Sequence, residues 1–195
     1  MQYDVWMVTP EVDDNFYRAS AAIAGAGSLT LLATTPGING YGFKVTFEAN
    51  SDTSGVNFTI VGYKVGDTTG NTTTEVVTGP NLTSSSTNYY SGVVSISASA
   101  ATANLVKIGH DASLALPRTR IKGLYYVGNA NAGSLTVASP NRTVPFVKII
   151  TPTSSNSFAD SLFLAAEGVL VGNVQANDYA TVTTANVTAF TLTCG

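Results

Sequence analysis

Histidine chemistry in this chain is limited to one residue, His110. A zinc site or an acid–base pair built on several imidazoles is therefore excluded. A Ser-His-Asp triad would need His110, a serine and Asp111, but neighbouring residues on a strand point to opposite faces. The chain also lacks a Gly-x-Ser-x-Gly elbow. We predict that His110 is a polar residue at a strand end with no catalytic role.

The only closely spaced carboxylates are Glu11, Asp13 and Asp14. Paired carboxylates can hydrolyse a glycan by general acid–base catalysis, and clustered oxygens can bind Ca²⁺. Here the spacing matches no calcium-loop signature, and we expect an exposed loop in which the acids stay ionised. The Gly-Ala-Gly stretch at 25–27 lacks the rest of a phosphate-binding loop. The sequence thus predicts no metal, no cofactor and no enzymatic activity.

Arg118, Arg120 and Lys122 alternate along an expected strand and so project from one face. This stripe is either a solvated strand face, a surface that docks an acidic protein, or a nucleic-acid site. Nucleic acid is disfavoured, because no stacking aromatics lie nearby and the chain has a net charge of −3. The same acidic balance argues against an anionic membrane as a partner.

The aromatic candidates for an interface are Trp6 and two pairs, Tyr89-Tyr90 and Tyr125-Tyr126. Because side chains alternate along a strand, one tyrosine of each pair should face the core and the other should face solvent. Outward tyrosines bury a large area at low entropic cost and are favoured at interfaces. Each outward tyrosine is therefore either an interface residue or ordinary surface.

Charged residues make up 11% of the 195 residues, against about 25% in average soluble domains. Ser, Thr, Asn and Gly take their place; threonine suits strands and the others suit turns. Few Lys and Glu also means few strong helix formers, so we expect an all-β fold. A surface with so little charge is either simply neutral and polar or is covered by neighbouring subunits, since interface cores are depleted in charge.

Cys194 is the only cysteine, so no intrachain disulfide can form, which fits synthesis in a reducing cytosol. The stretch 1–4 has no basic start followed by an apolar run, so no secretory signal is expected. No apolar run approaches the ~18 residues of a membrane-spanning helix.

Alternating apolar and polar residues, interrupted by Gly, Asn and Pro, predict antiparallel strands joined by tight turns. Val56–Val65 and Thr73–Thr78 flank a Gly-Asp-Thr-Thr-Gly-Asn turn. Phe16–Gly27 is Ala-rich and tolerates a single turn of helix, but Gly25 and Gly27 would cut a helix short, so an irregular arm or an edge strand is favoured. The other expected strands are Tyr3–Thr9, Ser28–Thr34, Gly42–Ala49, Gly92–Ser99, Asn104–His110, Thr119–Gly128, Ser134–Ala138, Val144–Ile150, Ser157–Leu164, Gly168–Val174 and Ala180–Thr193.

We expect these strands to form two small antiparallel β-sandwich or barrel-like domains. Turn residues recur about every 8 to 12 residues, which is the spacing of such folds. Asp111–Pro117 is expected to be a hinge, which places the domains at 1–117 and 118–195. Residues 1–27 are expected to form an extended N-terminal arm that reaches a neighbouring subunit.

Short strand and turn motifs are spread over both halves of the chain. The first half contains Phe58–Gly62 (F-T-I-x-G), Asp67–Asn71 (D-x-x-G-N), Thr74–Pro80 (T-E-x-x-x-G-P) and Val93–Ile96 (V-x-S-I). The second half contains Ala132–Val137 (A-G-S-L-x-V), Ile150–Pro152, Ala166–Val171 and Thr188–Phe190. Together these motifs resemble the modules of tailed-bacteriophage virion proteins. A departure is Ala165-Ala166, where such proteins often carry proline.

The resemblance implies a non-enzymatic virion structural protein that is made in the host cytoplasm. It points first to a decoration or cement protein that stabilises the capsid shell. Its partners would be copies of itself, for example in trimers, and the major capsid protein. One alternative is a tail, neck or fibre-base component with tail or neck partners. The other is a carbohydrate- or receptor-binding module that needs an exposed aromatic platform such as Tyr89-Tyr90.

Overall fold

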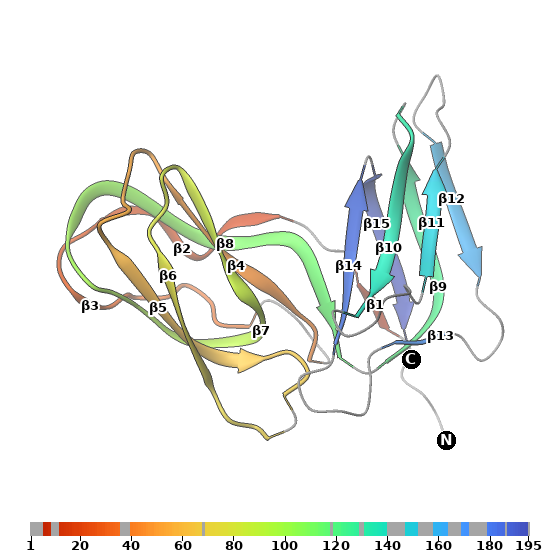
Figure 1. Cartoon of the computed structure of the whole chain (residues 1–195), viewed down its shortest axis with the longest axis horizontal. Helices are drawn as coiled ribbons and strands as arrows, with labels where there is room; N and C mark the ends of the chain where they lie inside the picture. The colour runs from red at the N-terminus through yellow and green to blue at the C-terminus, as the bar shows by residue number, and fades with distance from the viewer. Residues whose placement is uncertain are drawn as a thin grey trace. The chain divides into compact units, whose positions relative to one another are not determined.

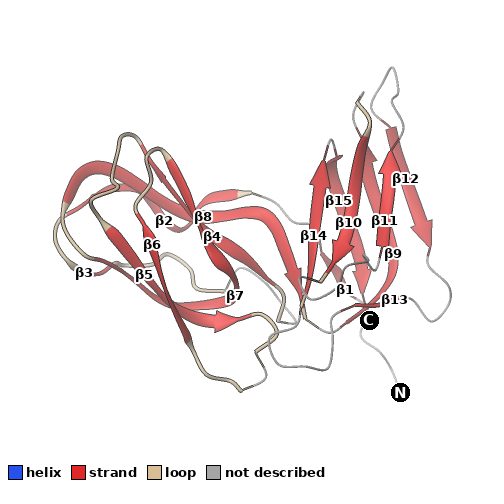
Figure 2. Cartoon of the chain, viewed as in Figure 1, coloured by secondary structure: helices blue, strands red, loops and turns tan. Residues whose placement is uncertain are grey.

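Every regular element in the described part of the chain is a β-strand (Figures 1 and 2). The computed structural model describes residues 6–8, 12–35, 40–67, 69–117, 119–128, 131–139, 147–151, 158–163, 169–171, 179–185 and 187–194. Each strand pair whose register is described is antiparallel. The predicted all-β antiparallel class is confirmed. It follows from segments rich in Thr, Val and aromatic residues, which fit a pleated surface.

Contacts group the chain into a central unit, Glu11–Ser113, and a terminal unit, Met1–Pro10 with Leu114–Gly195. The start of the chain joins its end because β1 (Trp6–Val8) pairs with β15 (Val187–Cys194). The expected domains, 1–117 and 118–195, placed the two paired strands in different domains. Strand β8 (Thr102–Leu116) runs without a break through the segment that was expected to be a hinge.

The central unit is one continuous set of strands in the order β6-β5-β7-β4-β8, with β3 on β7 and β2 on β8. Strand β7 pairs with β4 through residues 83–90 and with β5 through residues 90–98. A single strand therefore joins two parts of the sheet. The elements of this unit, besides β8, are β2 (Asp13–Ile23), β3 (Gly27–Ser28), β4 (Gly42–Ala49), β5 (Asn57–Lys64), β6 (Thr73–Thr78) and β7 (Thr83–Ala98).

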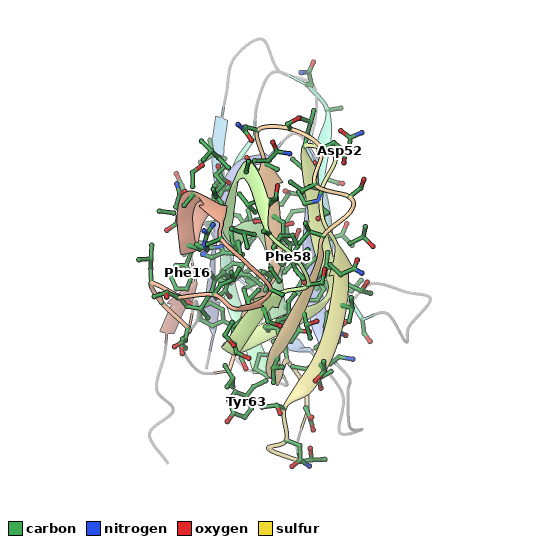
Figure 3. All side chains as sticks on the ribbon, turned by 90° about the vertical axis from the view of Figure 1, so that its left-hand side faces the viewer. Phe16, Asp52, Phe58 and Tyr63 are labelled. Carbon is green, nitrogen blue, oxygen red and sulfur yellow. The ribbon has the colours of Figure 1, made fainter. Side chains whose placement is uncertain are left out.

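The two parts of this sheet face each other across a common core, as in a sandwich. Phe47 on β4 and Phe58 on β5 are fully buried, and their rings stack at 4.7 Å although their strands are not paired. Val45 and Ile60 belong to the same core cluster. Figure 3 shows Phe58 inside the unit, whereas Tyr63 on the same strand lies at the outer surface.

Strand β7 changes from one layer to the other at two bulges. Its pairing with β5 skips Val94 and Ser91, each of which is an extra residue on β7. An extra residue reverses which side chains face the core and bends the strand. As a result Tyr90, Val93 and Ile96 are all buried, a spacing of three that strict alternation does not allow. Bulges of this kind let a strand turn a corner between two packed layers.

The alternation predicted for Gly42–Ala49 is confirmed in β4, where Phe43, Val45 and Phe47 are buried. The turn predicted after β5 is also present. Gly66 and Gly70 have φ angles of 82° and 71°, which favour glycine.

The segment after β3 covers a sheet edge instead of forming the strand predicted at Ser28–Thr34. Leu29 donates a backbone hydrogen bond to the carbonyl of Ile96 on β7 at 2.8 Å. Leu32 donates one to the carbonyl of Tyr17 on β2, also at 2.8 Å. Its backbone groups therefore link β7 to β2 across one side of the unit, and this requirement outweighs the strand propensity of the sequence.

Other boundaries also differ from the sequence-based expectation. The Ser/Thr run at 83–87, which precedes the strand expected at Gly92–Ser99, is the first part of β7, because residues 83–85 pair with β4. Of the alternatives for Phe16–Gly27, the edge strand is confirmed over most of the segment, as β2. Ala180–Thr193 is two strands, β14 (Ala180–Ala185) and β15, rather than one.

The terminal unit contains two groups of strands. One has the order β1-β15-β9-β12, with β13 also on β9; in the other, β11-β10-β14 continues onto residues 114–116 of β8. Leu135, Val182 and Leu192 are among its buried residues. The remaining bounds are β9 (Thr119–Gly128), β10 (Gly133–Ala138), β11 (Val147–Thr151), β12 (Phe158–Phe163) and β13 (Val169–Val171).

Gly79→Ala should destabilise the central unit, because a methyl group there would collide with the carbonyl oxygens of Thr53 and Val56. Overpacking of this kind typically costs about 1–3 kcal/mol of unfolding free energy. The matched control is Gly55→Ala, where no atom lies within 4 Å of an added Cβ. Urea denaturation of both variants checks this; equal stabilities would contradict the packing described around Gly79.

Candidate functional site

His110 is packed in an aromatic cluster and is not at a strand end, so the predicted position is wrong. It lies inside β8 and is 6% exposed. Its ring stacks on Phe43 with centroids 4.4 Å apart and meets Phe16 edge-on at 5.1 Å. The Nδ1 atom lies 3.2 Å from the carbonyl oxygen of Asp111. These contacts give the imidazole a packing role in the core.

Asp13 and Asp14 lie in a strand and not in the expected loop, and Asp14 helps to hold strands together. Asp13 and Asp14 begin β2, while Glu11 lies outside the described residues. Lys107 Nζ on β8 lies 2.8 Å from the carboxylates of both Asp14 and Glu48. Hydrogen bonds to Asp14 and then Glu48 raise the pKa of Lys107. Among the described residues no group of three His, Cys, Asp or Glu is placed to bind a metal.

Arg18 also has a structural role. Its guanidinium donates to the carbonyl of Val106 at 2.6 Å, and to those of Ala21 at 3.0 Å and Ala22 at 2.9 Å. The register between β2 and β8 shifts repeatedly in this region, which leaves carbonyls without strand partners. Partial burial lowers the pKa of Arg18. The side chain thus stabilises an irregular edge strand.

The densest polar arrangement is the Glu75 cluster, made of Glu75 on β6 and Thr87, Asn88 and Tyr90 on β7. The carboxylate accepts hydrogen bonds from the backbone amides of Thr87 (2.5 Å) and Asn88 (3.1 Å). It also accepts bonds from Asn88 Nδ2 (2.9 Å) and the Tyr90 hydroxyl (3.0 Å). Since β6 pairs only with β5 in the sheet, these bonds connect β6 to the part of β7 in the facing layer.

Two fully buried tyrosines differ in how their hydroxyls are satisfied. Burial, and after it the charge of Glu75, raise the pKa of Tyr90, whose hydroxyl donates to Glu75. Burial alone raises the pKa of Tyr17, whose hydroxyl has no hydrogen-bond partner among the described residues. The first tyrosine stabilises a carboxylate; the second carries an unsatisfied polar group.

The predicted outward tyrosine at Tyr89-Tyr90 is absent, because both residues are buried, at 8% and 0% exposure. Tyr90 belongs to the core cluster of the central unit. Lys44 covers Tyr89, with its Nζ 5.4 Å from the ring centroid in a cation–π contact. This pair therefore offers no exposed aromatic platform.

The remaining predicted interface residues lie in the terminal unit. Tyr125 on β9 is 46% exposed, as predicted for one member of its pair. The backbones of Trp6 on β1 and of Arg120, Lys122 and Tyr126 on β9 are described, but their side chains lie outside the described part of the structure. Arg118 also lies outside the described residues.

A neutral strand face is the surface that sequence reasoning missed. We call it the outer β5–β6 face: Thr59, Val61 and Tyr63 of β5 with Thr74, Val76 and Thr78 of β6. Val76 is 60% exposed and Tyr63 is 46% exposed. Thr59 lies opposite Val76 in the register. The face carries no ionisable group except a tyrosine hydroxyl, and alternation of Thr and Val along β6 was the available signal.

Comparison with protein-family models, with characterised proteins and with solved structures gave no match. The described residues contain no helix long and apolar enough to cross a membrane. The arrangement of the described residues is therefore the basis for a functional proposal, together with the motifs of the sequence.

Glu75→Gln should lower the free energy of unfolding by about 1.5–3 kcal/mol, because hydrogen bonds to a charged group are lost and an amide NH₂ would face donors. The variant leaves side-chain size almost unchanged, so packing is preserved. Thermal or urea denaturation measures the effect. The matched control is Glu48→Gln, whose carboxylate lies near the surface; a larger loss for that variant would contradict the importance of the Glu75 cluster.

The two buried tyrosines should respond in opposite ways to loss of the hydroxyl. Tyr90→Phe should lower the free energy of unfolding by about 1 kcal/mol, since it removes a satisfied bond. Tyr17→Phe should be neutral or stabilising by about 1 kcal/mol, since it removes an unsatisfied group. Urea denaturation at pH 7 compares them; equal losses would contradict the described bonding.

Stability should also fall at alkaline pH. A tyrosine in the unfolded chain ionises near its ordinary pKa of about 10, whereas folded Tyr17 and Tyr90 keep their protons because their pKa values are raised. The folded state then binds more protons than the unfolded state. The free energy of unfolding is therefore unaffected by these tyrosines below a pH of about 10 and decreases above it. Tyr90→Phe should reduce this slope in denaturation curves between pH 8 and 11; an unchanged slope would contradict it.

Proposed function

We propose that this chain is a non-enzymatic structural protein of a tailed-bacteriophage virion, and in particular a decoration or cement protein of the capsid shell. The proposal combines the motif resemblance with the placement of charge. In a cementing role the chain would contact copies of itself and the major capsid protein. Each contact would stabilise the shell by mass action and without chemistry on a substrate.

The observation that carries the proposal is that Lys107, Arg18, Glu75 and their partners are engaged in holding the strands of the central unit together. Lys107 binds Asp14 and Glu48, Arg18 binds carbonyls, and Glu75 binds β7. What remains exposed includes the neutral outer β5–β6 face. A face without charge is suited to contacts with other subunits, because interface cores are depleted in charged residues.

The carbohydrate- or receptor-binding alternative receives less support. It was based on an aromatic platform at Tyr89-Tyr90, and both residues are buried. Of the exposed tyrosines, Tyr63 lies on β5 of the central unit and Tyr125 lies on β9 of the terminal unit. A tail, neck or fibre-base role uses the same kind of neutral surface and differs from a shell role in copy number.

Copy number on purified particles tests the proposal. Particles assembled with and without the gene are compared by quantitative mass spectrometry against the major capsid protein. We expect the chain to be present in hundreds of copies, roughly, as shell symmetry requires. Particles that lack it should release DNA at lower temperature. About a dozen copies or fewer would support the tail role instead, and absence from particles would overturn both virion roles.

A further inference from the structure

Strand β6 is an open sheet edge with few of the features that usually protect such edges. It is the last strand of its sheet path, and the described residues offer its outer edge no backbone partner. Its six residues pair with β5 without a register shift. The strand has no Lys, Arg or Pro to prevent edge-to-edge pairing, and its one charged residue, Glu75, is already bonded to β7 within the chain.

Other edges of the same unit are protected. Edge strand β2 is interrupted by register shifts and carries Arg18, whose side chain bonds backbone carbonyls. The edge of β7 beside β3 is bonded by Leu29 and Thr34. The regular, exposed edge of β6 is thus an exception within its own unit, and it borders the outer β5–β6 face.

We propose that β6 pairs with β6 of a second copy of this chain, antiparallel and about a two-fold axis through Val76. The inference rests on the proposed assembly role and names the strand and the register that would serve it. Antiparallel pairing places outward residues opposite outward residues. About this axis, Val76 lies opposite Val76 of the second copy, and Thr74 lies opposite Thr78.

The choice of a second copy follows from the residues of the strand. Its exposed side chains read Thr-Val-Thr in both directions, so the two-fold axis matches like with like. Glu75 would lie opposite Val77 instead of another Glu75, which avoids opposed carboxylates. Its carboxylate is already bonded by groups of β7. A strongly charged partner would find no complementary charge on this face.

The pairing should be weak in solution. A single strand pair of this length buries much less than the roughly 1,200–2,000 Å² of a stable interface. Presentation of many copies on one particle raises their effective concentration and so favours the pair. The same edge can therefore remain largely unpaired in dilute solution and become paired on a surface.

Cysteine cross-linking tests the register. Val76→Cys, in a Cys194→Ser background, would place two thiols opposite each other, with Cβ atoms about 4.5–5.5 Å apart. The matched control is Val94→Cys, a position with similar exposure on β7. At high protein concentration we expect covalent dimer to form about tenfold faster for Val76→Cys than for the control, because pairing raises the local thiol concentration. Equal rates, or no dimer from Val76→Cys, would overturn the pairing.

Introducing a charge at the centre of the proposed pair gives a second test, which measures self-association and does not depend on disulfide chemistry. Val76→Lys would oppose two like charges across the axis, and Val94→Lys is its control. Sedimentation velocity at rising protein concentration should show self-association of the wild type and the control at the highest concentrations, where the weak pair forms, and its loss for Val76→Lys. Loss in both variants, or in neither, would overturn the proposal.

The two proposals can fail separately. If the chain is present on particles but Val76→Cys gives no covalent dimer there, the β6 pairing is wrong and the virion role stands. If the dimer forms but the chain is absent from particles, the virion role is wrong and the pairing stands. Intact mass and non-reducing electrophoresis of purified particles distinguish these outcomes.

Discussion

The central unit depends on one strand that belongs to two layers. Strand β7 pairs first with β4 and then with β5, and the two bulges at Ser91 and Val94 allow this change. Without the bulges, strict alternation would not let Tyr90, Val93 and Ile96 all face the core. The core that results brings together rings from unpaired strands, such as Phe47 and Phe58. The Glu75 cluster then joins β6 to the facing layer on the side where no backbone ladder does.

Charged residues in this unit stabilise the fold and are not gathered into a reactive site. Lys107 links β8 to β2 and β4, and Arg18 satisfies carbonyls where the register of β2 shifts. His110 packs between aromatic rings. In a chain with 11% charged residues, this use of charge leaves neutral faces on the outside. That distribution favours a protein that acts by contact, and it connects the composition of the chain to the proposed assembly role.

The edge of β6 and the outer β5–β6 face belong to one argument about assembly. A neutral face by itself can contact many kinds of protein surface. An open strand edge is more selective, because it pairs only with a segment of extended backbone. The palindromic order of exposed side chains narrows the choice further, to a second β6. The functional surface of this protein would then come from backbone geometry and register, with side chains selecting the partner.

The sequence by itself determined the all-β class, most strand positions, the turn after β5 and the buried face of β4, because these depend on local alternation and on glycine. Only the tertiary structure decided that Tyr89 is covered, that residues 83–87 are strand, that Ser28–Thr34 covers an edge and that β1 joins the terminal unit. Each depends on a partner distant in the sequence. The Glu75 cluster could likewise not be predicted from the sequence, since the carboxylate and its donors come together only when β7 bends. Local patterns specify which residues form strands, whereas bulges and distant hydrogen bonds specify which faces are covered.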